Sequence, residues 1–241
     1  MKEFSTSEVV STGWEYAKSH GILVAVILFV VGLVASGVGS IFGTTIDASQ
    51  IQSMTERMSQ GDTAAMQQYF ETIGNQSTGT WISSLVETIV MTGLFNYALL
   101  VMKGQANSLE FSVFKLPLAT YLKYFAVEII VGIIMVVGFC CCIVPGIFLG
   151  ARLALAGVYV VDNPEAGVFD AISASWRMTN GHTGGMIGLG FIFVGISILG
   201  FLCCCIGVYF AEVVILFATV AAYLALKSEA PAGYVESEYQ K

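Results

Sequence analysis

Four charged side chains lie inside stretches of the chain that are otherwise apolar: Glu87, Glu128, Arg152 and Glu212. A charged group at the middle of a bilayer costs roughly 2.5 to 3.5 kcal/mol on insertion scales, so each calls for a partner or a purpose. An arginine among three carboxylates could relay protons or ions, or could bind a zwitterionic or anionic headgroup. The plainer alternative, which we favour, is a buried structural ion pair.

Six cysteines form two triplets. They are Cys140, Cys141, Cys142, Cys203, Cys204 and Cys205. Adjacent cysteines are poorly spaced for tetrahedral zinc, so we predict no metal site. A disulfide between the two triplets is an alternative in an oxidising compartment. The simpler interpretation is that cysteine serves here as a small, buried, apolar residue in tight turns.

Signatures of catalysis are nearly absent. The two histidines, His20 and His182, have no histidine partner at the spacing that a metal hydrolase needs. No nucleophile elbow occurs, and the glycine-rich stretch 181–185 does not follow a predicted strand as a phosphate loop would. We therefore predict no catalytic residue, no cofactor and no enzymatic activity.

The composition defines the setting in which these residues act. The chain has 241 residues, of which 56% are hydrophobic and 11% charged, with a mean hydropathy of +0.80. About a quarter of the residues of a globular domain are charged, so this chain has too few charged residues to cover the surface of a water-soluble protein of its size. The net charge of -7 argues against nucleic-acid binding. The composition indicates a polytopic membrane protein.

Four apolar stretches are long enough to cross a bilayer, which takes about 20 residues. They are 21–43, 81–102, 121–161 and 186–226. Each of the last two would be roughly 60 Å long as one helix, so each must contain two spans. The first breaks at Cys142–Gly146, where Pro145 removes a helical donor, and the second breaks near Cys205–Gly207. We predict an all-α fold with six transmembrane helices.

Basic residues predict the orientation of these spans. Eight lysines and arginines lie in or beside the termini and the second and fourth connections, and only Arg57 lies in the others. Positive charge stays in the cytoplasm, so both termini are predicted there. Glu87, Arg152 and Glu212 then lie about 8 to 11 Å from the outer ends of their helices, and Glu128 lies at a similar depth from the inner end.

Two amphipathic helices are expected along the cytoplasmic interface. The first covers 7–20, with Ser7 as N-cap and with Val10, Trp14 and Ala17 on one face.

The second has Asn163 as N-cap, Pro164 in its first position and Gly181 as its stop. Its apolar side comprises Val168, Phe169, Ile172 and Trp176. The outer loop should hold two further short helices, separated by Gly61 and Asp62.

The resulting boundaries are an interfacial helix in 1–20, spans at 21–43 and 81–102 around an outer loop at 44–80, a cytoplasmic loop at 103–120, a hairpin at 121–161, an interfacial helix in 162–185, a hairpin at 186–226 and a cytoplasmic tail at 227–241. The two hairpins share a pattern, because Gly138–Ile143 reappears as Gly200–Ile206 with a cysteine offset of 63 residues. We predict a parallel tandem repeat.

The region from Ser108 to Leu226 resembles the membrane domain of glycerophosphoryl diester phosphodiesterase and its stand-alone six-helix prokaryotic relatives. The residues that carry the resemblance are Ser108–Phe114, Pro145, Gly146, Arg152, Asp162, Ala171, Ser175, Trp176, Thr179 and Gly181, with Trp14 ahead of the first span. In the full-length enzymes a separate soluble barrel carries the phosphodiesterase chemistry, and this chain has no room for it. The resemblance therefore implies an envelope protein of unassigned function in a prokaryotic inner membrane. This chain departs from the family pattern in its cysteine triplets and its long outer loop.

The function that we predict is that of a non-enzymatic integral membrane protein, either structural, lipid-associating or an accessory subunit of a complex. Its expected partners are membrane lipid and a protein partner or a second copy of the chain, and not nucleic acid. The alternative is a small transporter or channel that uses the Glu/Arg cluster, and a membrane-embedded enzyme is the remote third. The many glycines at four-residue spacing fit packing within one chain and oligomerisation equally well.

Overall fold

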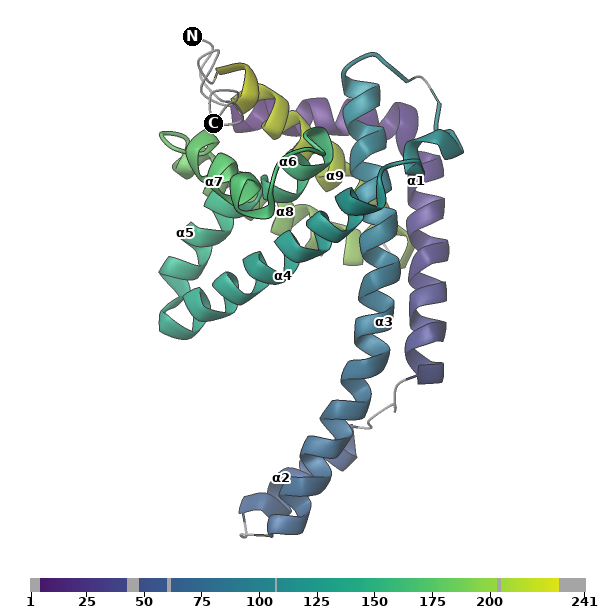
Figure 1. Ribbon diagram of the computed structural model, residues 1–241, viewed down its shortest axis with the longest axis vertical. Coiled ribbons are helices and arrows are strands. Elements are labelled where there is room, and N and C mark those ends of the chain that lie inside the picture. Colours follow the sequence, from purple (N-terminus) through teal and green to yellow (C-terminus); the bar gives the residue numbers. More distant parts are fainter. Residues whose placement is uncertain (1–4, 43–47, 60–61, 107, 203–204, 230–241) are drawn as a thin grey trace. The chain divides into compact units, whose positions relative to one another are not determined.

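The computed structural model describes residues 5–42, 48–59, 62–106, 108–202 and 205–229. These residues form helices and no strand, as Figure 1 shows. The helices are α1 (Thr6–Phe42), α2 (Ala48–Ser59), α3 (Thr63–Met102), the short 3-10 helix η1 (Phe111–Phe114), α4 (Leu118–Cys141), α5 (Ile143–Leu153), α6 (Ala156–Asp162), α7 (Val168–Met178), α8 (Thr183–Leu202) and α9 (Cys205–Glu229).

Six helical segments are long and apolar enough to cross a membrane. They are Thr6–Val34, Ser83–Met102, Leu118–Cys141, Ile143–Asp162, Thr183–Leu202 and Gly207–Ser228. Large apolar side chains such as Ile22, Val136 and Phe191 are more than half exposed on these segments, which suits contact with lipid. The predicted all-α, six-span, multi-pass class is confirmed.

The chain divides into two compact units. One contains the residues up to Leu28 together with those from Met91 onward, and the other is Phe29–Val90. Each is described by itself below.

The smaller unit contains α2 and the first part of α3. The predicted second short helix of the outer loop is continuous with the second span, because α3 begins at Thr63 and no proline interrupts it. Asp62 caps its start, with Oδ1 accepting the backbone N–H groups of Ala64 (2.9 Å) and Ala65 (3.2 Å). Arg57 donates to the same carboxylate over 2.7 Å, which holds the pKa of Asp62 below its usual value.

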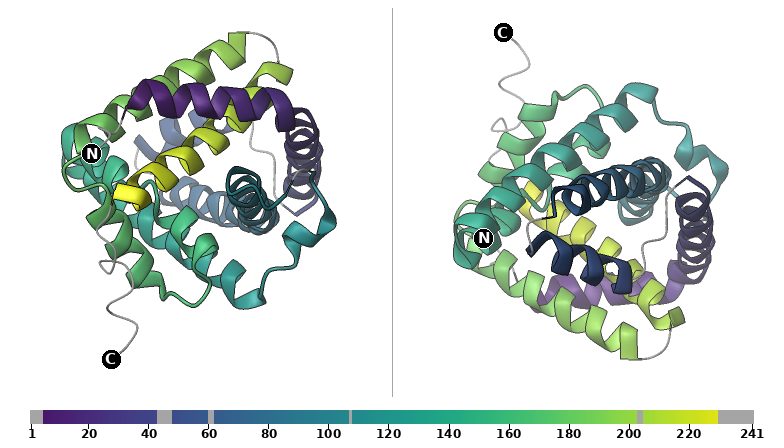
Figure 2. Two further views of the ribbon diagram at one scale, coloured as in Figure 1. Left: turned by 90° about the horizontal axis from the view of Figure 1, so that it is seen from above. Right: turned by 90° about the horizontal axis from the view of Figure 1, so that it is seen from below.

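In the larger unit, the start of α1 packs closely on α9. A Cβ on Gly13 would lie 2.7 Å from the backbone nitrogen of Ala218, and Trp14 meets Phe210 edge to face, with 5.6 Å between the ring centroids. Figure 2 shows the purple start of α1 crossing the yellow α9. The helix predicted over 7–20 is not separate from the first span, because α1 continues through Gly21. Its place at the membrane interface stays a prediction.

The predicted turn in the first hairpin lies where α4 ends. Cys142 has extended backbone angles (φ -169°, ψ 157°), and Pro145 follows in the first turn of α5, where its missing N–H does no harm. A Cβ on Gly138 would come within 3.1 Å of the Cα of Gly146, so two glycines let α4 and α5 meet closely.

The second hairpin contains a matching contact between α8 and α9. A Cβ on Gly200 would lie 2.7 Å from the carbonyl oxygen of Gly207. The close approach of two glycines at both turns fits the predicted repeat. The repeat is not complete, because the fourth span is interrupted between Leu153 and Ala156 whereas α9 is continuous.

The second helix predicted for the interface corresponds in its residues to α7, but α7 starts later than expected. Asn163 does not cap it: its Nδ2 donates to the carbonyl of Tyr159 over 3.0 Å and so closes the end of α6. The backbone N–H of Gly167 instead donates to Asp170 over 2.8 Å at the start of α7. Gly181 follows the helix with φ +86°, as its predicted role as a stop requires.

The contact between α1 and α9 gives a test of the packing. Gly13→Ala places a methyl group against the backbone of Ala218, so it should lower the free energy of unfolding by about 1 to 3 kcal/mol. Gly188→Ala in α8 is the matched control, because open space surrounds that position and alanine favours a helix by about 0.5 to 1 kcal/mol. Thermal unfolding of the detergent-solubilised variants measures both, and equal stability of the two would contradict the packing.

Candidate functional site

The interruption of the fourth span is closed by side chains of α7. Ser175 donates to the carbonyl oxygen of Arg152 over 2.8 Å and accepts the backbone N–H of Leu155 over 3.2 Å. Thr179 Oγ1 lies 3.3 Å from the same carbonyl and 2.8 Å from the Ser175 carbonyl, so its one proton is shared between the two. Both hydroxyl residues are fully buried. They provide the partners that the broken helix cannot give its own backbone.

The packing of α7 explains how these hydroxyls reach the interruption. The side of α7 that faces the protein is made of the small residues Ala171, Ala174 and Ser175, with Met178 buried at the end of the helix. Phe169, on the predicted apolar side, is 73% exposed. Small residues allow α7 to approach α4, α5 and α6 closely, so that a short hydroxyl side chain can bond their backbone.

Arg152, in the last turn of α5, has a side chain enclosed by α7 and the start of α8. Arg152 as a whole is 5% exposed. The guanidinium carbon lies 4.3 Å from the ring centroid of Trp176 and 5.8 Å from that of Phe148. Its Nη1 lies 3.3 Å from Oδ1 of Asn180 and 3.3 Å from Oγ1 of Thr183. Aromatic faces and neutral oxygens therefore surround the charge.

Neither of the predicted carboxylate partners in the larger unit forms an ion pair with Arg152. Arg152 takes part in none of the ion pairs found among the described residues. Glu128 is exposed on α4, with its carboxylate beside Gly157 of α6, and Glu212 is exposed on α9. Glu87 belongs to the smaller unit. The structure thus gives Arg152 an amide and a hydroxyl as polar partners in place of the expected glutamates.

An apolar groove runs beside the interruption. It has a volume of about 510 Å³ and is lined by side chains of α4, α5, α8 and α9, among them Met135, Phe139, Ala154, Met186, Phe193 and Ala222. Ala154 and Leu155, the two residues between α5 and α6, both line it. Its volume lies within the range of small-molecule sites, which is about 300 to 1,000 Å³.

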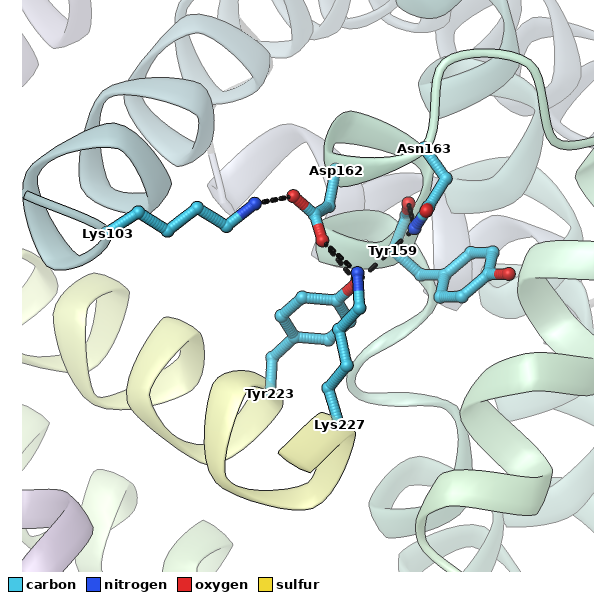
Figure 3. Close-up of polar contacts among 6 residues, drawn as sticks. All are labelled: Lys103, Tyr159, Asp162, Asn163, Tyr223 and Lys227. Atoms are coloured by element: carbon cyan, nitrogen blue, oxygen red, sulfur yellow. Dashed lines mark hydrogen bonds and ion pairs between the residues drawn. The ribbon is translucent and has the colours of Figure 1, made fainter. Parts of the chain in front are cut away.

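A second polar site forms at the other end of the interrupted span, and Figure 3 shows it. Asp162 ends α6 with a side chain that is 5% exposed. Its Oδ1 pairs with Lys103, directly after α3, and its Oδ2 accepts from Lys227 over 2.6 Å and from Tyr223 over 2.8 Å, both on α9. We call Asp162, Lys103, Tyr223 and Lys227 the Asp162 cluster. It fastens the ends of three spans together.

The remaining residues singled out by the sequence lie in several places. The thiols of Cys140, Cys141 and Cys142 are free and exposed, not buried as we expected. Cys203 and Cys204 lie outside the described residues, as does the side chain of Cys205.

The stretch Ser108–Phe114 folds onto the end of α3. Asn96 donates to the Val113 carbonyl over 2.8 Å, and the ring of Phe114 covers Gly93.

Several residues of these sites were not predicted. Asn180 and Thr183 contact Arg152, while Lys103, Tyr223 and Lys227 surround Asp162. Lys103 and Lys227 are used above only among the eight basic residues that predict the orientation of the spans. A signal existed for them, since a lone aspartate ending an apolar span needs cations from the ends of neighbouring spans. No signal in the sequence points to Asn180.

The chain matches no family model, and comparison with curated proteins and with solved structures gives no match either.

Ser175 provides a direct test of how the interruption is held. Ser175→Ala leaves a buried carbonyl and a buried N–H without this partner, so it should lower the free energy of unfolding by about 1 to 3 kcal/mol. Ser173→Ala is the matched control, because Ser173 lies on the exposed side of the same helix. Thermal unfolding in detergent measures both variants. An unchanged melting temperature for Ser175→Ala would show that α7 does not hold the interruption.

Proposed function

We propose that this chain is a non-enzymatic integral membrane protein that binds a membrane lipid, with an acyl chain of the lipid in the groove lined by α4, α5, α8 and α9. The observation that carries the proposal is the groove itself, which has almost wholly apolar walls and lies between transmembrane helices. An acyl chain is the apolar ligand that a bilayer supplies at high concentration.

The construction of the groove supports a specific site. Gly150 and Ala151 of α5, and Ala154 directly after it, leave space where larger side chains would fill it. Gly190 of α8 has open space around its Cβ position. Met135 and Met186 add flexible apolar walls that adapt to a chain of irregular shape. The interruption at Ala154 and Leu155, held by Ser175, fixes this wall of the groove.

We propose a prokaryotic inner membrane as the setting, because the resemblance described above implies one. We propose that both termini lie in the cytoplasm, because eight basic residues lie in or beside the termini and the second and fourth connections and only Arg57 lies in the others. We also propose kinship with the membrane domain of glycerophosphoryl diester phosphodiesterase. Four residues of the shared pattern have structural roles in or beside α7. Ser175 and Thr179 bond the backbone at the interruption, Trp176 covers Arg152, and Gly181 ends α7.

Filling the groove tests the proposed function. Gly190→Leu projects a side chain into the groove, so it should abolish the binding of dioleoylglycerol and dioleoyl phosphatidic acid to the delipidated protein in native mass spectrometry. Gly195→Leu is the matched control, because that glycine of α8 also has open space around it but does not line the groove. Binding that survives Gly190→Leu unchanged would overturn the proposal.

The exposed first triplet tests the orientation. In a variant with Cys203, Cys204 and Cys205 replaced by serine, a membrane-impermeant maleimide should label Cys140, Cys141 and Cys142 in intact cells. Labelling measured by a mass shift should be the same before and after permeabilisation. Labelling that requires permeabilisation would place this turn in the cytoplasm and reverse the proposed orientation.

A further inference from the structure

Arg152 is a buried cation with unused capacity to bind an anion. It is 5% exposed, and its Nε has no hydrogen-bond partner within the part of the chain that the structure describes. Removing a charge from water costs several kcal/mol, and a partner of opposite charge normally compensates that cost. Trp176 and Phe148 supply only the weaker attraction of aromatic faces.

The polar contacts of the guanidinium are also long. Both join Nη1 to a neutral oxygen, of Asn180 or Thr183, over 3.3 Å. Hydrogen bonds from a cationic nitrogen to an anionic oxygen are about 2.7 to 2.9 Å long and about twice as strong as neutral ones. An anion would therefore replace these contacts with better ones.

The start of α8 provides further donors at the same place. Thr183 is its first residue, and the first N–H groups of a helix have no acceptor within the helix and lie at the positive end of its dipole. Gly184 is exposed, and nothing lies within 4 Å of its Cβ position, so the first turn is open to a ligand. Thr183 Oγ1 already donates to the Thr179 carbonyl over 3.1 Å, which makes Thr183 a positioning residue for Arg152.

This cationic site lies next to the apolar groove. Thr183 precedes Met186 and Ile187 by three and four residues, which places all three on one face of α8. Met186 and Ile187 line the groove. A ligand with an anionic head and an apolar chain would therefore fit the two sites together, with its head at the first turn of α8.

We propose that Arg152 and the first turn of α8 bind the phosphate of a phospholipid whose acyl chain occupies the groove. The inference rests on the proposed function and adds the chemical class of the headgroup. Phosphate is favoured because the Nε and Nη2 edge of the guanidinium forms a fork that matches its geometry, with Nε unpartnered among the described residues, and because helix N-termini bind phosphate.

The test compares two ligands that differ only in the phosphate. Dioleoyl phosphatidic acid should bind the delipidated wild-type protein about tenfold or more tightly than dioleoylglycerol in native mass spectrometry. Arg152→Gln should reduce this preference to near parity while dioleoylglycerol still binds. Arg177→Gln is the matched control, because it removes an exposed arginine of α7 and should leave the preference unchanged.

A second variant covers the case in which Arg152→Gln does not fold. Asn180 is exposed, so Asn180→Asp should be tolerated, and it places a carboxylate beside the guanidinium in competition with the phosphate. This variant should lose the preference for phosphatidic acid by a similar factor and keep its affinity for dioleoylglycerol.

The outcomes separate the two proposals. Equal binding of both lipids by the wild-type protein, or a preference that survives Asn180→Asp, would overturn the phosphate site and leave the groove intact. Dioleoylglycerol binding that survives Gly190→Leu would overturn the groove. Inorganic phosphate that raises the melting temperature of the wild type but not of Asn180→Asp, without a preference between the lipids, would assign the site to free phosphate and overturn the headgroup proposal.

Discussion

The larger unit depends on one constraint, which is that a backbone inside a membrane must find hydrogen-bond partners within the protein. The fourth span does not form one continuous helix, and the interruption leaves the Arg152 carbonyl and the Leu155 N–H in need of partners. Ser175 and Thr179 supply them. Because these hydroxyls are short, α7 must lie directly against the span. Its buried residues beside the hydroxyls are accordingly alanines, Ala171 and Ala174, whereas the large Phe169 side chain is exposed.

This arrangement also accounts for the positions of Arg152 and of the groove. The residues between α5 and α6 form part of the groove wall, and the residue whose carbonyl the hydroxyls bind carries the buried guanidinium. A single local break therefore brings an apolar volume and a cationic group close together. That combination is what an amphipathic ligand requires, and it underlies both functional proposals.

Sequence reasoning succeeded where a property is spread over many residues. Apolar length placed six spans, and Pro145 and Gly181 marked a turn and a helix end because their backbone preferences are local. Sequence reasoning failed where a single tertiary contact determines the partner of a side chain. Asn163 looked like an N-cap but bonds backward to Tyr159, and Arg152 looked like the partner of a glutamate but meets Asn180. The sequence of α5 does not predict its end at Leu153, since no proline or glycine is found there. The break is stabilised by Ser175 and Thr179, which lie over twenty residues later.

The Asp162 cluster has a consequence for the order in which the protein assembles. Lys103 precedes Asp162 in the chain, whereas Tyr223 and Lys227 are synthesised about sixty residues after it. During insertion, Asp162 can pair with Lys103 as soon as the fourth span is in place, but its other oxygen must wait for the sixth. Asp162 can thus pair with Lys103 before the last helix is inserted. Insertion of that helix completes the Asp162 cluster and buries the carboxylate.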